Sequence, residues 1–410
     1  MKKEEKAPEV YEEYLRLCRD IQYADPSGAA VSAAGLFDGL RSADPLERSR
    51  AWDSLCGAWN RRRSDFAPLL ARASAEKNAD ARARFGMDPA PLLAAVGDTK
   101  ELLLRALERK AARIGAGGFR FCDIWARVPN AGNSDAVPLA AALAGLGDIL
   151  ERHLEGGKAF VEEVSAGRLH LEEQAVDCPH CGTPVPGGPV HAYMPLRFGK
   201  VRPCDLPSLA HELGHVMHCD LLDELAPGGP IGAVFLETFS QFLEGIVWLE
   251  LCDAAEFRAL RGDLLLDKLT EETLDLLLFP AMLEFEGRMI TSARKGPLPL
   301  EDVEGAYREI LGRWFGVSPE GTWFWMRSKT LYDPRWPFRD LTYLLGRMVS
   351  LELVQRVRAG GKMSRDEYRR AVADTISTDF SGYRRRQGRT SPMMTADWAE
   401  MLAPVRDMFK

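Results

Sequence analysis

Long apolar runs are absent from this sequence: it has no stretch of eighteen or more apolar residues, so no membrane-spanning helix is expected. The opening segment MKKEEKAPEVYEEYLRLCRD also lacks the apolar core of a secretion signal. Without such a signal, the eight cysteines, most of them scattered, favour a cytoplasmic protein with reduced thiols. Positive charge is not in excess, because the net charge is -7 at pH 7. This balance gives no electrostatic reason to expect binding to nucleic acid or to an anionic membrane.

The residues that are present suit a mainly α-helical protein with one small β-sheet. Hydrophobic residues make up 46% of the chain and charged residues 28%, so a sizeable core can form. Apolar residues recur at three- and four-residue steps over much of 9–115, over 138–165 and from residue 205 onward, which predicts helices there. Between 176 and 204 the chain is rich in proline and glycine and holds one β-like run, VHAYMPLRF. We therefore expect a mainly α fold whose small sheet comes just before the helix that begins near residue 205.

Histidine is scarce, with seven residues in the chain, yet three of them lie within the segment SLAHELGHVMH. On a helix, His211 and His215 lie one turn apart on one face. Two imidazoles at this spacing suit one zinc ion, and His-Glu-x-x-His is a zinc signature. Glu212 projects from the edge of the same face, where its carboxylate could hold a water molecule beside the metal. An ordinary helix surface is the alternative for the motif taken alone.

A catalytic zinc site needs a third protein ligand and one open position. Histidine is not expected to supply it, because none follows His218, and His218 lies about two turns from His211 on the same helix. We expect His218 to pack or to support a ligand instead. In AVFLETFSQFLEG, Glu237 stands among phenylalanine and leucine residues, where an unpaired carboxylate is costly to bury. We therefore predict one catalytic Zn²⁺ bound by His211, His215 and Glu237.

Glu244 follows Glu237 by seven residues and lies on the same face of this predicted helix. It could accept a hydrogen bond from a ligand histidine and so fix the orientation of that ring. A plain surface position is the alternative for Glu244.

The motifs LAHELGHVMH and FLETFSQFLEG together resemble the thimet oligopeptidase and oligoendopeptidase F family of zinc metallopeptidases, which are gluzincins. In that family the first motif reads His-Glu-x-Gly-His-x-x-His and the second reads Glu-x-x-Ser-Gln-x-x-Glu. The resemblance implies that His211, His215 and Glu237 bind the zinc and that Glu212 is the general base. It covers residues from about 40 to 400 and implies a helical, zincin-like metallopeptidase fold with the small sheet next to the active-site helix.

The resemblance also implies a cytoplasmic, zinc-dependent endopeptidase that hydrolyses oligopeptides. Residues 1–115 would form an N-terminal helical lobe, shorter than is usual in the family, and residues 116–410 would form the catalytic region. The family has a histidine and tyrosines near the C-terminus that contact the substrate. Here LYDPRWPFRDLTYLLGR resembles that segment without its histidine, and Tyr343 matches the last tyrosine. We predict that Tyr343 donates a hydrogen bond to the developing oxyanion, with Tyr332 as the next candidate and a packed core aromatic as the alternative.

Two further features precede the histidine motif. Pro195 within the β-like run is typical of an edge strand, so we expect residues 191–196 to flank the cleft and to bind an extended peptide. The segment CPHCG at 178–182 resembles half of a structural zinc site, but a plain reduced turn is the preferred interpretation.

Two other functions remain open at this point. A zinc carboxypeptidase of related helical fold would use a positive group, such as Arg339 or Arg347, to grip the terminal carboxylate of its substrate. A non-catalytic relative would bind zinc and peptides without turnover. Glu212 favours an enzyme, because a protein without catalysis has little physical reason to keep a general base beside its metal.

Overall fold

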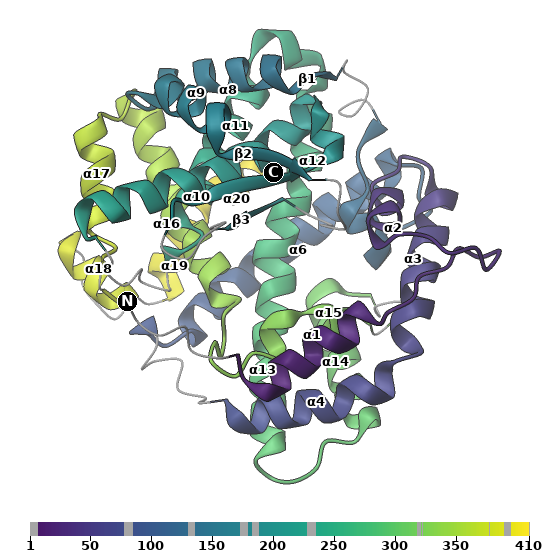
Figure 1. Cartoon of the computed structure of the whole chain (residues 1–410). Helices are drawn as coiled ribbons and strands as arrows, with labels where there is room; N and C mark the ends of the chain where they lie inside the picture. Colours follow the sequence, from purple (N-terminus) through teal and green to yellow (C-terminus); the bar gives the residue numbers. More distant parts are fainter. Residues whose placement is uncertain are drawn as a thin grey trace. The chain divides into compact units, whose positions relative to one another are not determined.

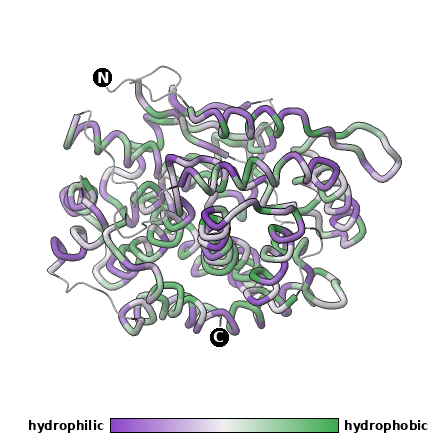
Figure 2. Tube along the Cα trace, turned by 90° about the horizontal axis from the view of Figure 1, so that it is seen from below, coloured by the Kyte–Doolittle hydropathy of each residue, from purple (hydrophilic) through white to green (hydrophobic). Residues whose placement is uncertain are grey.

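The computed structural model describes residues 7–77, 85–129, 136–172, 179–182, 188–227, 235–317, 321, 323–376, 378–388 and 395–409. Over these residues the chain is mainly helical, with two small β-sheets (Figure 1). The predicted mainly α fold is therefore confirmed. None of the described helices is long and apolar enough to cross a membrane. Figure 2 shows hydrophobic and hydrophilic stretches alternating along the chain, as expected where helices bury one face.

The chain forms two compact units, each assembled from separate stretches of sequence. The first unit contains Met1–Ala83, Val96–Arg127 and Leu269–Leu341, and the second contains Arg84–Ala95, Val128–Lys268 and Thr342–Lys410. Three helices belong partly to each unit, namely α6 (Ala90–Arg113), α12 (Arg261–Thr273) and, by its first residue alone, α16 (Leu341–Gly360). The predicted division into an N-terminal helical lobe at 1–115 and a catalytic region at 116–410 stays a prediction.

The first unit is built from helices packed around aromatic rings. Besides parts of α6 and α12, its elements are α1 (Glu9–Arg19), α2 (Ala33–Leu40), α3 (Pro45–Asn60), α4 (Arg63–Glu76), η1 (Phe121–Trp125), η6 (Leu274–Leu278), α13 (Phe279–Ala293), α14 (Leu300–Phe315), α15 (Phe324–Arg327) and η7 (Lys329–Leu331). The ring of Trp323 lies 5.3 Å from that of Trp52 and 6.1 Å from that of Trp59. Tyr332 stacks on Tyr14 at 4.3 Å and is fully buried, so it is a packing residue.

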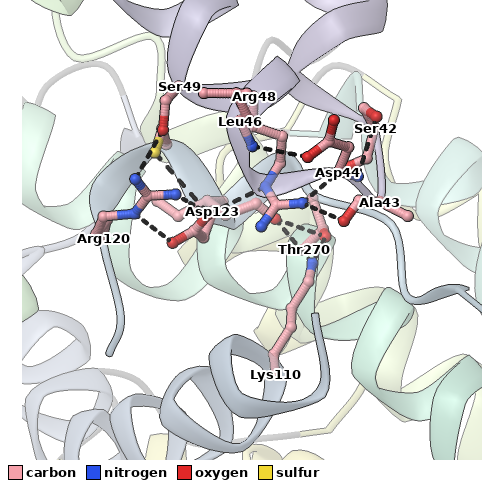
Figure 3. A network of polar contacts seen from close by, with 12 residues as sticks. Ser42, Ala43, Asp44, Leu46, Arg48, Ser49, Lys110, Arg120, Asp123 and Thr270 are labelled. Atoms are coloured by element: carbon pink, nitrogen blue, oxygen red, sulfur yellow. Dashed lines mark hydrogen bonds and ion pairs between the residues drawn. The ribbon is translucent and has the colours of Figure 1, made fainter. Parts of the chain in front are cut away.

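A buried polar network ties together separate segments of the first unit (Figure 3). Arg48 is fully buried and donates to the Asp123 carboxylate at 3.1 Å, and Arg120 donates to the same carboxylate. In the same view, Lys110 donates to the Thr270 hydroxyl at 2.6 Å. Lys110 also donates to the backbone carbonyl of Ile124 in η1 at 2.9 Å. Charges buried this deeply are tolerated only when they are paired, so the network holds α3, α6 and η1 together.

The second unit carries the histidine motif on α10. Its elements include α8 (Leu139–His153), α9 (Gly157–Gly167), η2 (Leu196–Gly199), η3 (Pro203–Asp205), α10 (Leu206–Leu225), α11 (Thr238–Asp253), η5 (Ala255–Leu260), α16 (Leu341–Gly360), α17 (Arg365–Ala373), α18 (Phe380–Arg386), α19 (Thr395–Met401) and α20 (Ala403–Phe409). A two-stranded sheet pairs β1 (Val137–Pro138) with β5 (Lys200–Val201). Helices α8 and α9 lie side by side, and α10 packs along α11 (Figure 1).

The larger sheet lies next to α10, as predicted. Its strand order is β2 (Leu169–Glu172), β4 (His191–Pro195), β3 (His180–Gly182), and both β3 and β4 contact α10. The prediction of an edge strand at 191–196 is wrong, because β4 pairs with β2 on one side and with β3 on the other. Among the described strands, the one at the edge nearest to the histidine motif is instead β3, the shortest of the three.

Gly214 sets how closely α10 and α11 approach each other. A methyl group on residue 214 would lie 2.6 Å from the Cα atom of Ser240 and 2.8 Å from the carbonyl oxygen of Phe239, which both belong to the backbone of α11. Backbone atoms cannot rotate away, so a side chain does not fit here. The contact falls between His211 and His215, and it therefore brings the start of α11 up to both histidines.

We expect Gly214→Ala to destabilise the protein by about 1–3 kcal/mol, the usual cost of overpacking a close-packed interior. Gly145→Ala is the control, because Gly145 is exposed in α8, nothing lies within 4 Å of an added Cβ atom, and alanine favours a helix. Urea-induced unfolding followed by circular dichroism measures both variants. A Gly214→Ala protein as stable as the wild type would show that α10 and α11 can separate without cost.

Candidate metal centre

Three side chains converge where α10 meets the start of α11. His211 and His215 lie one turn apart on α10, and Glu237 immediately precedes α11. The Oε2 atom of Glu237 lies 3.4 Å from Nε2 of His211 and 3.4 Å from Nε2 of His215. One ligand atom from each residue lies within 4.8 Å of the other two. The structure thus brings together the three residues that the sequence motifs singled out.

This arrangement fits a tetrahedral zinc ion. Zinc binds histidine nitrogen and carboxylate oxygen at about 2.0–2.2 Å, so two ligand atoms of one tetrahedral ion lie about 3.4 Å apart. The two nitrogen–oxygen separations of 3.4 Å match that value. Three protein ligands would leave a fourth position open, as in catalytic zinc sites. In the part of the chain that the structure describes, no other three metal-binding side chains come together in this way.

The charges of the cluster stabilise one another. Glu237 is buried, with 8% of the residue exposed, and burial acts to raise its pKa. His215 and His211 nevertheless lower the pKa of Glu237 well below its usual value. For His211, burial acts to lower the pKa, but hydrogen bonds with Glu237 and Glu244 raise the pKa well above its usual value. Glu237 is therefore ionised at neutral pH, as a zinc ligand must be.

Glu244 and Arg347 hold His211 in place. The Oε2 atom of Glu244 lies 2.9 Å from Nδ1 of His211, and Oε1 accepts a hydrogen bond of 3.0 Å from Arg347. Both residues are buried, with 5% and 2% exposed. A metal ion on Nε2 would take the place of the proton that the raised pKa of His211 favours, while Nδ1 still donates to Glu244. Sequence reasoning named Arg347 only as a substrate grip and missed this contact, because the two partners are 103 residues apart in the chain.

Glu212 lies next to this cluster on α10. It is 7% exposed, and none of the described residues forms a hydrogen bond with its buried Oε2 atom. The thiol of Cys181 donates to the backbone carbonyl of Glu212 at 3.2 Å, which joins β3 to α10. A buried carboxylate oxygen without a protein donor is suited to hold a water molecule and to take its proton.

Tyr343 lies in the first turn of α16 and is half-buried. The same helix passes close to the start of α11, since a methyl group on Gly346 would lie 3.0 Å from the carbonyl carbon of Glu237. Tyr343 precedes Gly346 by three residues and Arg347 by four, so the three share one face of α16. That face meets α11, and the role of Tyr343 as a hydrogen-bond donor stays a prediction.

His218 lies outside the cluster, one turn beyond His215. It is 2% exposed and packs against the ring of Phe239, with 4.7 Å between the ring centroids. Burial lowers the pKa of His218 to about 3, so the ring is neutral at physiological pH. This environment agrees with the packing role that we expected for His218.

The segment CPHCG is described only in part. His180, Cys181 and Gly182 form β3, whereas Cys178 lies outside the described residues. The hypothesis of a second zinc site at 178–182 therefore stays a hypothesis.

We expect Glu244→Gln to lower zinc affinity by about 10–100-fold, the range typical when the partner of a ligand histidine is changed. Glutamine keeps the volume but removes the charged acceptor that faces both His211 and Arg347. Competition with a fluorescent zinc chelator measures the affinity. The control is Glu250→Gln, which changes an acid further along α11 that pairs with Arg152 and should leave zinc binding unaltered. An unchanged affinity in Glu244→Gln would exclude this role.

No protein-family model matches the sequence, and no curated protein matches it. A solved structure provisionally assigned as oligoendopeptidase F has a TM-score of 0.75 and 18% identity, and the match covers 98% of this chain and 74% of the other. Oligoendopeptidase F from Enterococcus faecium has a TM-score of 0.65 and 16% identity, covering 98% and 69%. A provisionally assigned peptidase from Chlamydophila abortus has a TM-score of 0.70 and 15% identity, covering 97% and 72%. The chain therefore has the oligoendopeptidase F fold, which confirms the fold expected from the two motifs.

Proposed function

We propose that this chain, with the fold of the oligoendopeptidase F structures, is a zinc-dependent endopeptidase that hydrolyses oligopeptides. The observation that carries the proposal is the cluster of His211, His215 and Glu237 with the buried carboxylate of Glu212 beside it. The similar solved structures are named as peptidases, which supports the same class of reaction here.

The mechanism divides between metal binding and proton transfer. His211, His215 and Glu237 would hold one zinc ion, which when bound would act as a Lewis acid toward a water molecule and the scissile carbonyl. Glu212 would take the proton of the attacking water, because its Oε2 atom is buried and forms no hydrogen bond with the described residues. The same carboxyl group would then deliver that proton to the leaving amine, so Glu212 serves as base and afterwards as acid.

We propose β3 as the strand that binds the substrate main chain. Within the described residues it pairs with β4 alone, and Cys181 at its centre donates to the carbonyl of Glu212. An extended peptide can add to such an edge through main-chain hydrogen bonds. A peptide bound there would run past Glu212, with its scissile bond next to the proposed base.

Tyr343→Phe is expected to lower kcat by about 10²–10³-fold with little change in KM, because the hydroxyl would donate to the oxyanion only in the transition state. Steady-state hydrolysis of a quenched fluorescent peptide measures both constants. Tyr383→Phe is the control, since Tyr383 is a buried tyrosine of α18 whose ring packs against Phe235 and Phe380. A Tyr343→Phe enzyme with the wild-type kcat would make Tyr343 a packing residue only.

Cleavage of a mixed peptide library, read by mass spectrometry, tests the proposed function. The zinc-loaded protein is expected to cut internal peptide bonds, and the cuts should vanish after chelation and in Glu212→Gln. Loss of single C-terminal residues would identify a zinc carboxypeptidase instead. The pairing of Arg347 with Glu244 does not favour that outcome, because it already engages one of the two arginines considered as a grip. No cleavage by the zinc-loaded protein would contradict a peptidase and leave a zinc- and peptide-binding protein.

A further inference from the structure

A row of stacked rings crosses one face of the larger sheet. His170 of β2, Tyr193 of β4 and His180 of β3 lie directly opposite one another in the register of the three strands. The centroid of the Tyr193 ring is 5.2 Å from that of His170 and 5.1 Å from that of His180, and the ring planes differ by 26° and 16°. These separations are typical of stacked aromatic pairs. The row therefore continues from one edge of the sheet to the other.

This row lies on the face of the sheet that points away from α10. Successive side chains of a strand point to opposite faces, so the neighbours of the row point toward α10. Among these neighbours, Ala192 is fully buried and the thiol of Cys181 donates to the backbone carbonyl of Glu212. His180 is exposed and Tyr193 is half-buried. A peptide that binds along β3 can therefore reach the outer end of the row.

The row ends at His180 with one face of its ring uncovered. Tyr193 lies against one face, and none of the other rings in the described part of the chain lies against the second face. Neighbouring strands of a sheet are about 4.7–4.9 Å apart, close to the spacing of the rings in the row. A strand added beside β3 would thus place one residue directly opposite His180, at the distance where a further ring would stack.

We propose that His180 recognises an aromatic side chain of the bound peptide, which would extend the row by one ring. The inference rests on the proposed function, because it takes β3 as the strand that binds the substrate main chain. Cys181, the neighbour of His180, joins β3 to the backbone of Glu212. The aromatic residue of the substrate would therefore lie close to the bond that is cut. The preferred substrates would be peptides with phenylalanine, tyrosine or tryptophan at this one position.

Fluorescence anisotropy with the zinc-loaded Glu212→Gln protein tests this recognition without turnover. The probes are short labelled peptides of alanine and serine in which one phenylalanine or one cyclohexylalanine is moved along the chain. Cyclohexylalanine has nearly the same size and is apolar but not aromatic. At one position we expect phenylalanine to bind about 3–10-fold more tightly, as is typical of a stacked aromatic pair. Equal binding at every position would overturn the proposal, as would the absence of binding by all peptides.

Two substitutions of His180 in the same protein show whether its ring is responsible. His180→Leu should bring the two peptides to equal affinity, because leucine keeps an apolar surface but has no ring. His180→Phe should retain the preference, because it keeps a ring at the end of the row. A preference for phenylalanine that survives His180→Leu would overturn the proposal.

The matched control is His170→Leu, the same change at the other end of the row. His170 lies on β2, and β4 and β3 separate it from a peptide bound beside β3. This variant should keep the preference for phenylalanine, and circular dichroism should show that all variants are folded. Loss of the preference in His170→Leu as well would show that His180 does not decide it and would overturn the proposal.

Failure of this inference can be told apart from failure of the proposed function. If phenylalanine is preferred in binding but the wild-type protein cuts no peptide, the peptidase proposal fails and the recognition by His180 stands. If the wild-type protein cuts a mixed library with no aromatic residue enriched at any position near the cuts, the recognition fails and the peptidase proposal stands.

Discussion

Replacing Glu212 by glutamine is expected to lower kcat for peptide cleavage by about 10³-fold while zinc stays bound. Glutamine has nearly the same volume as glutamate but cannot take a proton from water. The substitution does not touch the three ligand atoms, which belong to His211, His215 and Glu237. Steady-state kinetics with a fluorogenic peptide, together with the zinc content of the same preparation, measure the two quantities separately.

Glu224→Gln is the matched control for this prediction. Glu224 lies on the same helix, α10, but is exposed and pairs with Arg369. The Glu224→Gln substitution therefore makes the same chemical change away from the cluster. Its kcat should equal that of the wild type. A Glu212→Gln enzyme with full zinc content and wild-type kcat would contradict the assignment of Glu212 as the base. Loss of zinc together with activity would show instead that Glu212 supports the metal.

Replacing Glu237 by glutamine is expected to abolish activity by removing zinc. Its effect on zinc affinity should exceed the roughly 10–100-fold effect expected for a residue that only supports a ligand histidine. The amide cannot supply the negative charge that now lies 3.4 Å from both histidine nitrogens. Zinc at a thousand times its Kd stabilises a native protein by about 4 kcal/mol and so raises its Tm. A variant that no longer binds zinc should show no such rise of Tm when zinc is added.

Thermal unfolding with zinc and with a chelator measures this effect without reference to activity. The wild type and the control Glu250→Gln should both show a higher Tm with zinc, whereas Glu237→Gln should show the same Tm in both conditions. Glu250 is suited as the control because it lies on α11 and pairs with Arg152. A full zinc response in Glu237→Gln would mean that the third ligand is another residue.

Local patterns in the chain were enough to predict the residues of the candidate centre. His211 and His215 are four residues apart, and the regular period of an α-helix places such a pair on one face whatever the rest of the fold does. Glu237 was noticeable because a carboxylate inside an apolar stretch must find a partner. The mainly helical fold also follows from local periodicity, and the similarity to the oligoendopeptidase F structures confirms it.

The arrangement within the sheet could not be read from local patterns. VHAYMPLRF was recognisable as a strand, but Pro195 suggested an edge, whereas β4 lies between β2 and β3. Strand order depends on which distant segments pair. The same alternation of apolar and polar residues occurs in a central strand and in a small edge strand, so it does not tell the two apart. The position of β3 beside Glu212 therefore became visible only in the folded chain.

Contacts between distant segments account for the other features that the sequence alone did not reveal. The two compact units each combine separate stretches of the chain, and Arg347 meets Glu244 across 103 residues. Gly214 and Gly346 are ordinary glycines in the sequence. Only the packing of α10 and α16 against α11 shows that a side chain does not fit at Gly214 and that Gly346 lies close to Glu237. Helical periodicity thus determines which residues share a face, because it is a property of neighbouring residues. The partner of each face is decided by packing, because packing joins residues that the chain keeps far apart.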